Sequence, residues 1–201
     1  MDPVILDRFI PRPDVRARHE ILVRAPAPTV LEVARAYDLQ SHPIVRAIFW
    51  LRTRILGGRQ PSAWRSQGLV ADMLRMGWAC LAEQPDRWFV AGAACQPWQP
   101  DVIFTPIPGD RFAAFAAPDQ VKIAWTLEVE ALGAVRTRLV TETRAVATDE
   151  SARRKFRQYW RLFGLGIRMI RWLLLPAVAR EAERRWRAHP DSARAVVGRR
   201  P

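Results

Sequence analysis

Few residues in this 201-residue sequence have the types and spacing that acid–base chemistry requires. Asp38 and His42 lie four residues apart, and a carboxylate near an imidazole is a common general acid–base pair. The same spacing places both residues at the start of a predicted helix, where Asp and Ser commonly cap the backbone. We therefore interpret this pair as part of a helix start and predict no catalytic residue.

The histidines and cysteines do not form a metal-ligand pattern. His19 and His189 are far apart in the predicted order of elements, and no Cys/His cluster accompanies either of them. Cys80 and Cys95 lie in apolar runs, where a free cysteine behaves as a small buried side chain. We expect no metal, no cofactor and no disulfide framework.

The chain is strongly basic, with a net charge of +12 and a pI of about 11.3. Such a charge attracts polyanions without specificity. At the basic C-terminal end, Glu181 and Glu183 are interleaved with arginines, as on an ordinary solvated helix face. No nucleic-acid recognition motif is present. We expect no specific nucleic-acid partner, and an anionic membrane surface remains a partner to be tested.

The elements that must position any site begin with a strand over 19–24 and helices over 30–37 and 43–56. The second helix carries an apolar stripe at helical spacing and ends at a pair of glycines. A helical turn over 69–76 and a hairpin of strands 78–83 and 87–95 follow. Residues 96–110 contain four prolines, which favours a loop. The apolar stripe of the predicted helix over 43–56 consists of Ile44, Ile48, Leu51 and Ile55.

Two alternating segments, 121–131 and 136–147, predict a pair of antiparallel strands with one apolar face. Trp125, Thr141 and Thr143 are on that face. Either Glu130 pairs with Arg136 and Glu128 with Arg138, or the register shifts by two and Lys122 pairs with Glu142. In both registers Glu142 and Arg144 are on the outer face, where we expect a surface ion-pair ladder.

A long helix is predicted from a cap at Thr148 or Ser151 to about Ala188, with Pro176 kinking or interrupting it. Its apolar stripe is Phe156, Trp160, Phe163, Ile167, Ile170 and Leu174. Leu162, Leu165, Met169 and Leu173 widen this apolar arc, as expected for a helix gripped by a sheet. Its polar face is Arg157, Arg161, Arg168 and Arg171. Residues 160–179 are long enough to span a bilayer. Three arginines inside this segment, each costing about 3 kcal/mol at mid-membrane, argue against a span. A helix that lies in the membrane interface without crossing the bilayer is still an alternative.

The order of elements predicts an α+β fold in which a curved antiparallel sheet wraps around the long C-terminal helix. The threonines on the final strand leave volume between sheet and helix, which predicts a pocket of several hundred Å³. We predict an N-terminal arm over 1–14, a ligand-binding domain over 15–189 and a disordered basic tail over 190–201. The N-terminus lacks the pattern of a signal peptide, so we expect a cytoplasmic location.

Two segments resemble the START-like superfamily, also called SRPBCC. They are HEILVRAPAPTV (19–30) and TLEVEALGAVRTRLVTETRAVATDESARRKFRQYW (126–160), and the resemblance covers roughly residues 16–180. It implies a helix-grip fold around a deep cavity. Members of that superfamily bind lipids, sterols, polyketides, quinones or plant hormones, and a minority are cyclases or hydrolases. Membership alone identifies no ligand.

We therefore expect a non-catalytic binding or carrier protein for a hydrophobic small molecule, lipid-, quinone- or polyketide-like. One alternative is a cyclase or aromatase-type enzyme, which needs two or more titratable groups converging in the pocket. Another is a peripheral membrane protein that uses the Arg/Trp face of the last helix. The candidate ligand-binding residues are Trp125, Thr141, Thr143, Tyr159, Trp160 and Phe163. Core packing would explain the aromatic residues of this set equally well. The threonines would be explained by their preference for β-strands.

Overall fold

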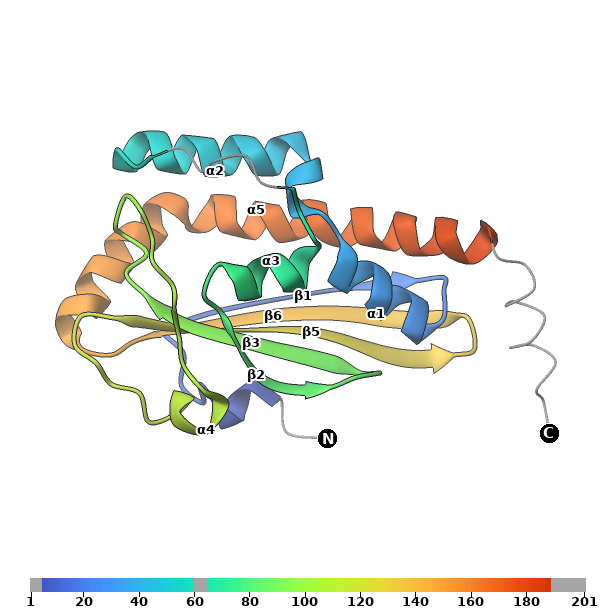
Figure 1. Ribbon diagram of the computed structural model, residues 1–201, viewed down its shortest axis with the longest axis horizontal. Helices are drawn as coiled ribbons and strands as arrows, with labels where there is room; N and C mark the ends of the chain where they lie inside the picture. The colour runs from blue at the N-terminus through green and yellow to red at the C-terminus, as the bar shows by residue number, and fades with distance from the viewer. Residues whose placement is uncertain (1–4, 60–64, 189–201) are drawn as a thin grey trace.

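In the computed structural model, which describes residues 5–59 and 65–188, six antiparallel strands form one curved sheet (Figure 1). The strands are β1 (Val15–Val23), β2 (Ala79–Gln84), β3 (Trp88–Cys95), β4 (Thr105–Pro106), β5 (Val121–Gly133) and β6 (Arg136–Ala147). Their order is β1-β6-β5-β3-β2, and β4 also pairs with β3. Because β1 and β2 remain edges, the sheet does not close into a barrel.

The helices are α1 (Ala27–Ala36), α2 (Pro43–Leu56), α3 (Leu69–Arg75), α4 (Gly109–Phe112) and α5 (Glu150–Ala188), with 3-10 turns η1 (Ile5–Arg8) and η2 (Leu39–Ser41). α1, α3 and α5 cover the inner face of the sheet, whereas η1 and α4 pack against its outer face. α5 runs along the sheet beside α1, whereas α2 lies on the side of α5 that faces away from the strands (Figure 1). The predicted α+β class and the long C-terminal helix are confirmed, and the predicted tail over 190–201 lies outside the described residues.

The ends of two helices differ from the prediction. α1 begins at Ala27 rather than at residue 30, with Pro26 as its N-cap residue. Pro28 lies in its first turn, where the missing N–H of a proline has no partner to lose. The cap of α5 is Asp149, whose Oδ1 accepts a hydrogen bond from the Ala152 N–H at 2.8 Å. The prediction of Thr148 or Ser151 at this position was therefore wrong. Pro176 lies inside α5 without ending it.

The β5–β6 register also differs from both predicted registers. Glu130 pairs with Arg138, and Lys122 pairs with Val146. The Arg138 guanidinium contacts the Glu130 carboxylate at 2.5 Å on the exposed end of the hairpin. Since the true register is shifted by an even number of residues, the apolar face stays intact, as the alternating pattern requires.

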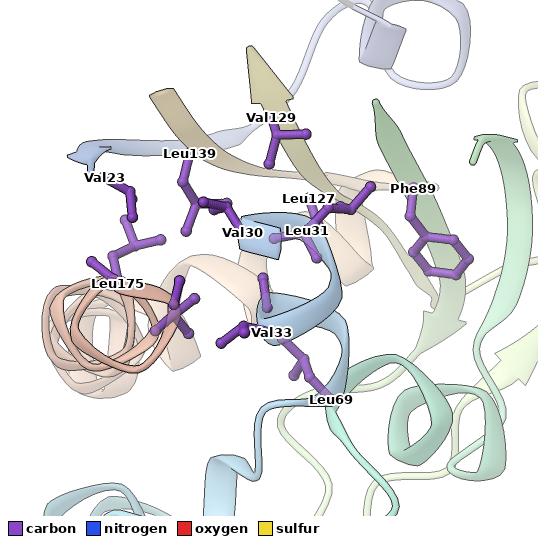
Figure 2. Close-up of a cluster of buried hydrophobic side chains, with 14 of the residues drawn as sticks. Val23, Val30, Leu31, Val33, Leu69, Phe89, Leu127, Val129, Leu139 and Leu175 are labelled. Atoms are coloured by element: carbon purple, nitrogen blue, oxygen red, sulfur yellow. The ribbon is translucent and has the colours of Figure 1, made fainter. Parts of the chain in front are cut away.

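The main core lies between the inner face of the sheet, α1 and α5. Figure 2 shows Val30, Leu31 and Val33 of α1 reaching into the space between the strands and α5. Leu175 of α5 packs against these side chains from the helix side, and Leu139 of β6 packs against them from the sheet (Figure 2). α1 thus fills much of the volume between sheet and helix.

A second, smaller core covers the outer face of the sheet. Leu6, Phe9 and Ile10 of the N-terminal arm are buried there, and the Phe9 ring packs edge-on against Phe112 of α4 at 6.0 Å. Gly92 is required beneath them, because a Cβ at this position would stand 2.7 Å from Phe112 and 2.5 Å from a methyl group of Leu81. The part of the outer face beneath η1 and α4 is therefore not a solvated surface.

Candidate functional site

A cavity of about 30 Å³ lies between the inner face of the sheet and α5. Its walls are apolar except at Thr141 and Arg171. The lining residues are Ala34, Leu69, Trp125, Leu127, Leu139, Thr141, Arg171, Leu174, Leu175 and Val178. The predicted volume of several hundred Å³ was wrong, because buried side chains of α1 fill much of the space between the sheet and α5 (Figure 2).

Trp125 and Thr141 form the polar centre of the cavity wall. The Trp125 indole N–H donates to Thr141 Oγ1 at 2.7 Å, and the Thr141 hydroxyl donates to the Thr126 carbonyl at 2.8 Å. Both side chains are buried. These two bonds fix the orientation of the indole, which presents an apolar surface to the cavity, as the Trp side chain does when its N–H is satisfied.

Arg171 brings a cation to the same cavity. Sequence periodicity placed it on the polar face of α5, but its side chain turns inward and Nη2 donates to Thr143 Oγ1. Nη1 is buried and has no hydrogen-bond partner. Burial lowers the pKa of Arg171 to about 10, which leaves the guanidinium protonated at neutral pH. Among the described residues, no carboxylate lies within ion-pair distance of it.

The other three predicted ligand residues lie in a separate cluster. Tyr159 is buried, Trp160 and Phe163 are partly buried, and all three pack around Val121 and Ala145 at the other end of β5 and β6. None of them lines the cavity. The structure therefore brings Trp125, Thr141 and Thr143 together with Arg171, and it separates Tyr159, Trp160 and Phe163 from that group.

Arg52 explains the position of Tyr159. Its guanidinium Nε donates to the Tyr159 hydroxyl at 3.2 Å, and Nη2 donates to the carbonyls of Pro97 and Gln99 at 3.0 and 3.1 Å. Arg52 therefore links α2 by hydrogen bonds to α5 and to the loop after β3. Its hydrogen bonds hold backbone and core together, which indicates a structural role for Tyr159.

His19 lies on the inward face of β1, where it pairs with Thr141 of β6. Its Nδ1 atom is buried without a partner. Burial, followed by the positive charges of Arg171 and Arg168, lowers the pKa of His19 below 6.5. The imidazole is therefore neutral at neutral pH.

The lowered pKa of His19 predicts a loss of stability in acid. Because the folded pKa lies below the unfolded value of 6.5, the unfolded chain binds the proton first, and stability falls as the pH drops from 6.5 through the folded pKa. Above 6.5 His19 contributes nothing. Denaturant titrations at about pH 7.5 and about pH 5 should show a smaller acid loss for His19→Gln than for the wild type. Equal losses in both proteins would contradict the predicted pKa.

Glu142 and Arg144 are buried, contrary to the expected surface ladder. The Arg144 guanidinium contacts Glu142 at 2.7 Å and Asp7 of η1 at 2.5 Å, and it donates to the Ile10 carbonyl at 2.8 Å. Arg16 Nε donates to the same oxygen of Glu142, Oε1, at 2.9 Å, and Arg16 Nη2 donates to Oε2 at 3.2 Å. The face assignment was correct, but the N-terminal arm covers that face. This network anchors the arm, and it does not border the cavity.

The remaining candidates for chemistry have structural roles. Asp38 Oδ1 accepts from the Gln40 N–H at 2.8 Å, which is the capping contact that the sequence suggested, and no hydrogen bond joins it to His42 within the described chain. Cys95 is buried, and burial raises its pKa to about 12. Cys80 is exposed, contrary to its apolar sequence context. Within residues 5–59 and 65–188, no group of His, Cys, Asp and Glu could hold a metal ion.

Nine large apolar side chains of α2 and the middle of α5 are exposed, and we call this set the α2–α5 face. Its members are Ile44, Phe49, Trp50, Leu51 and Ile55 of α2 and Leu162, Leu165, Met169 and Trp172 of α5, each 44–76% exposed. The predicted stripe of α2 therefore faces solvent for the most part. α2 rests on α5 near Gly166, where a Cβ would stand 3.2 Å from Ile48 Cγ2.

The charged side chains that α2 and the middle of α5 carry have one sign. α2 contains no Asp or Glu, and α5 contains none between Glu150 and Glu181. Exposed arginines, including Arg46, Arg54, Arg161 and Arg168, are interspersed with the apolar side chains. Monomeric proteins seldom expose so many neighbouring large apolar side chains, and such a surface usually contacts another molecule. By length and composition alone α5 could also cross a membrane, although core helices of soluble proteins have the same properties.

Comparisons with solved structures give remote likenesses, two of which are described below. No known family and no curated protein matches the chain. The crystal structure of the Zhui aromatase/cyclase from Streptomyces sp. R1128 is 17% identical, covers 85% of this chain and 94% of its own, and gives a TM-score of 0.30. A hypothetical protein from Helicobacter pylori is 13% identical over 71% of this chain and 76% of its own, with a TM-score of 0.32.

At these identities and TM-scores, neither structure bears on what the chain binds or does. The chain is an α+β protein with an open, curved antiparallel sheet and a long C-terminal helix. That arrangement is compatible with the helix-grip fold implied by the resemblance to the START-like superfamily.

Proposed function

We propose that the chain is a non-catalytic binding protein for an apolar small molecule held between the inner face of the sheet and α5. The cavity at this interface, with apolar walls and two polar side chains, carries the proposal. Ligand sites typically combine apolar walls with a few placed polar groups. The cavity has about the volume of one water molecule in the liquid, so a larger occupant requires α1 and α5 to move apart.

A groove on the outside of the molecule marks where such an opening would occur. It has a volume of about 420 Å³ and lies along the seam between α1 and the C-terminal part of α5. Val33 and Ala177 line the groove, and their chain neighbours Ala34 and Val178 line the cavity. Both spaces therefore border α1 and the C-terminal part of α5. Outward movement of α1 would join them into a pocket large enough for a small apolar molecule.

The composition of the cavity wall favours binding over catalysis. Arg171 is the one titratable side chain among the described lining residues. Its pKa of about 10 keeps it protonated at neutral pH, so it does not act as a general base there. A cyclase-type enzyme would need at least a second titratable group converging on the same space.

Ala34→Val tests the proposed site. Two added methyl groups would fill the cavity, and removing a cavity of this size gains about 0.7 kcal/mol, which roughly offsets the lower helix propensity of valine. We expect an unchanged free energy of unfolding within about 1 kcal/mol and loss of the bound molecule. Purified protein is extracted into organic solvent, and mass spectrometry compares the extracts of wild type and variant.

Ala36→Val is the matched control, because Ala36 lies on the same helix but is exposed and lines the groove on the outside. Its extract should match that of the wild type. An apolar molecule present in all three extracts at equal amounts would place the binding site elsewhere. Extracts of wild type without any such molecule would argue against a carrier.

We also propose a second function, peripheral binding to an anionic membrane through the α2–α5 face. The exposed apolar side chains and the lack of carboxylates on this face support it. Apolar side chains insert at the lipid interface, while arginines attract anionic headgroups. In flotation assays the protein should rise with vesicles of phosphatidylcholine and phosphatidylserine and remain below with phosphatidylcholine alone. Vesicle binding that depends on neither anionic lipid nor salt concentration would contradict this second function.

A further inference from the structure

The side chain of Arg171 places an unneutralised positive charge in the sheet–helix interface. Nη1 is buried without a hydrogen-bond partner, and Nη2 donates to Thr143 Oγ1. No carboxylate of the described chain lies within ion-pair distance. A buried charge normally has a charged partner, because its desolvation is otherwise uncompensated.

The residues around Arg171 do not neutralise its charge. Leu174, Leu175 and Val178 follow it on α5 and are apolar, and so are the strand residues that line the cavity apart from Thr141. The hydroxyl of Thr141 already donates to the Thr126 carbonyl and accepts from Trp125. The walls therefore contain no anion that could neutralise the guanidinium.

His19 gives an independent sign that a partner is missing. Its buried Nδ1 also has no hydrogen-bond partner, and it lies on the inward face of β1 opposite Thr141. The positive charges of Arg171 and Arg168 act on it. Two orphaned polar nitrogens thus lie on the inward side of one strand pair and the helix above it, where an acceptor group would satisfy them.

We infer that Arg171 is an anion subsite, and that it binds the carboxylate of an otherwise apolar molecule whose tail lies between the sheet and α5. This inference rests on the proposed binding function. A planar guanidinium matches a planar carboxylate with two parallel hydrogen bonds. Arg171 is the one cation among the described lining residues, which matches the single negative charge of a carboxylate, whereas a phosphate carries more charge. The class of ligand is therefore an apolar carboxylic acid.

The test compares decanoate with decanol, which have the same chain length and differ in charge, by isothermal titration. Wild type should bind decanoate at least tenfold more tightly than decanol. Arg171→Met keeps the length of the side chain and removes the charge, so it should lose this preference while its affinity for decanol is unchanged. Arg168→Met removes an exposed arginine one turn earlier and should behave like the wild type.

Two further readouts separate the subsite from a structural role. Without ligand, Arg171→Met should unfold at a higher temperature than the wild type, because an uncompensated buried charge is removed. Decanoate, unlike decanol, should raise the pKa of His19 measured by NMR, because it neutralises Arg171. Equal affinity of the wild type for both probes would overturn the anion subsite and leave the binding function intact. Failure of both probes to bind would overturn the binding function together with the subsite.

Discussion

Replacing Arg144 with methionine is expected to lower the free energy of unfolding by about 3 kcal/mol. The substitution leaves the buried carboxylate of Glu142 without its closest partner, and Asp7 loses the contact that anchors the N-terminal arm. Arg16 still contacts Glu142 at 2.9 Å, so the loss falls at the lower end of the range for a broken buried pair. Chemical denaturation monitored by tryptophan fluorescence measures the change.

Arg138→Met is the matched control on the same strand. Arg138 contacts Glu130 at 2.5 Å, but both side chains are partly exposed, so its replacement should cost less than about 1 kcal/mol. The double variant Glu142→Met/Arg144→Met should be more stable than Arg144→Met alone, because no buried charge is left unpaired. A change below about 0.5 kcal/mol for Arg144→Met would show that the arm does not depend on this network.

Much of the fold could be predicted from the sequence, because its signals are local. Alternation in 121–131 and 136–147 gave the two long strands and their inward face, and the turn at Pro85-Asp86 gave the hairpin of β2 and β3. The register was not predictable from charge pairs alone. Glu130 had basic residues at both 136 and 138 within reach, and any shift by two keeps the same faces.

The outer face shows why burial is harder to predict than orientation. The pattern correctly separated Glu142 from Thr141 and Thr143, and polar residues on one side of a strand usually face water. Whether they do depends on which distant segment covers them. Here Leu6, Phe9 and Ile10, more than 130 positions earlier in the chain, cover Glu142 and Arg144.

Arg171 was missed because the stripe of α5 was traced from its N-terminal half. The buried residues of the C-terminal half, Leu175, Val178 and Ala182, lie four, seven and eleven positions after Arg171. That spacing places Arg171 on their side of the helix. Tracing the period backwards from the C-terminal end would have identified an arginine on an inward stripe, which is an unusual position for a charged residue.

The width of the apolar arc on α5 had two explanations, and the sequence could not separate them. We attributed all of it to a sheet that grips the helix. The structure assigns part of it to the core and leaves Leu162, Leu165, Met169 and Trp172 exposed beside α2. These four residues follow one another at three- and four-residue spacing, so they form a stripe of their own on the helix surface.

Leu162→Ser/Leu165→Ser is expected to reduce binding to phosphatidylserine-containing vesicles about 100-fold. The two leucines are 62% and 65% exposed and lie one turn apart in the centre of the α2–α5 face. Each leucine that enters the lipid interface contributes about 1.5 kcal/mol, so the pair contributes about 3 kcal/mol. Because both side chains face solvent in the free protein, the free energy of unfolding should change by less than about 1 kcal/mol. Vesicle flotation over a series of lipid concentrations measures the affinity.

Leu22→Ser/Leu132→Ser provides the control, because it makes the same chemical change away from the α2–α5 face. Leu22 is 49% exposed on the outer side of β1, and Leu132 is 39% exposed at the end of β5, so neither contacts lipid in the proposed orientation. This variant should bind vesicles like the wild type. Equal losses in both double variants would indicate a general effect of exposed leucines, and binding retained by Leu162→Ser/Leu165→Ser would rule out the α2–α5 face as the membrane surface. Membrane docking requires a selective loss of binding in Leu162→Ser/Leu165→Ser. It also requires weaker binding in high salt, where the Debye length falls from about 10 Å to about 3 Å. Both effects are expected because the apolar stripe contacts the acyl region of the lipid and the surrounding arginines contact its headgroups.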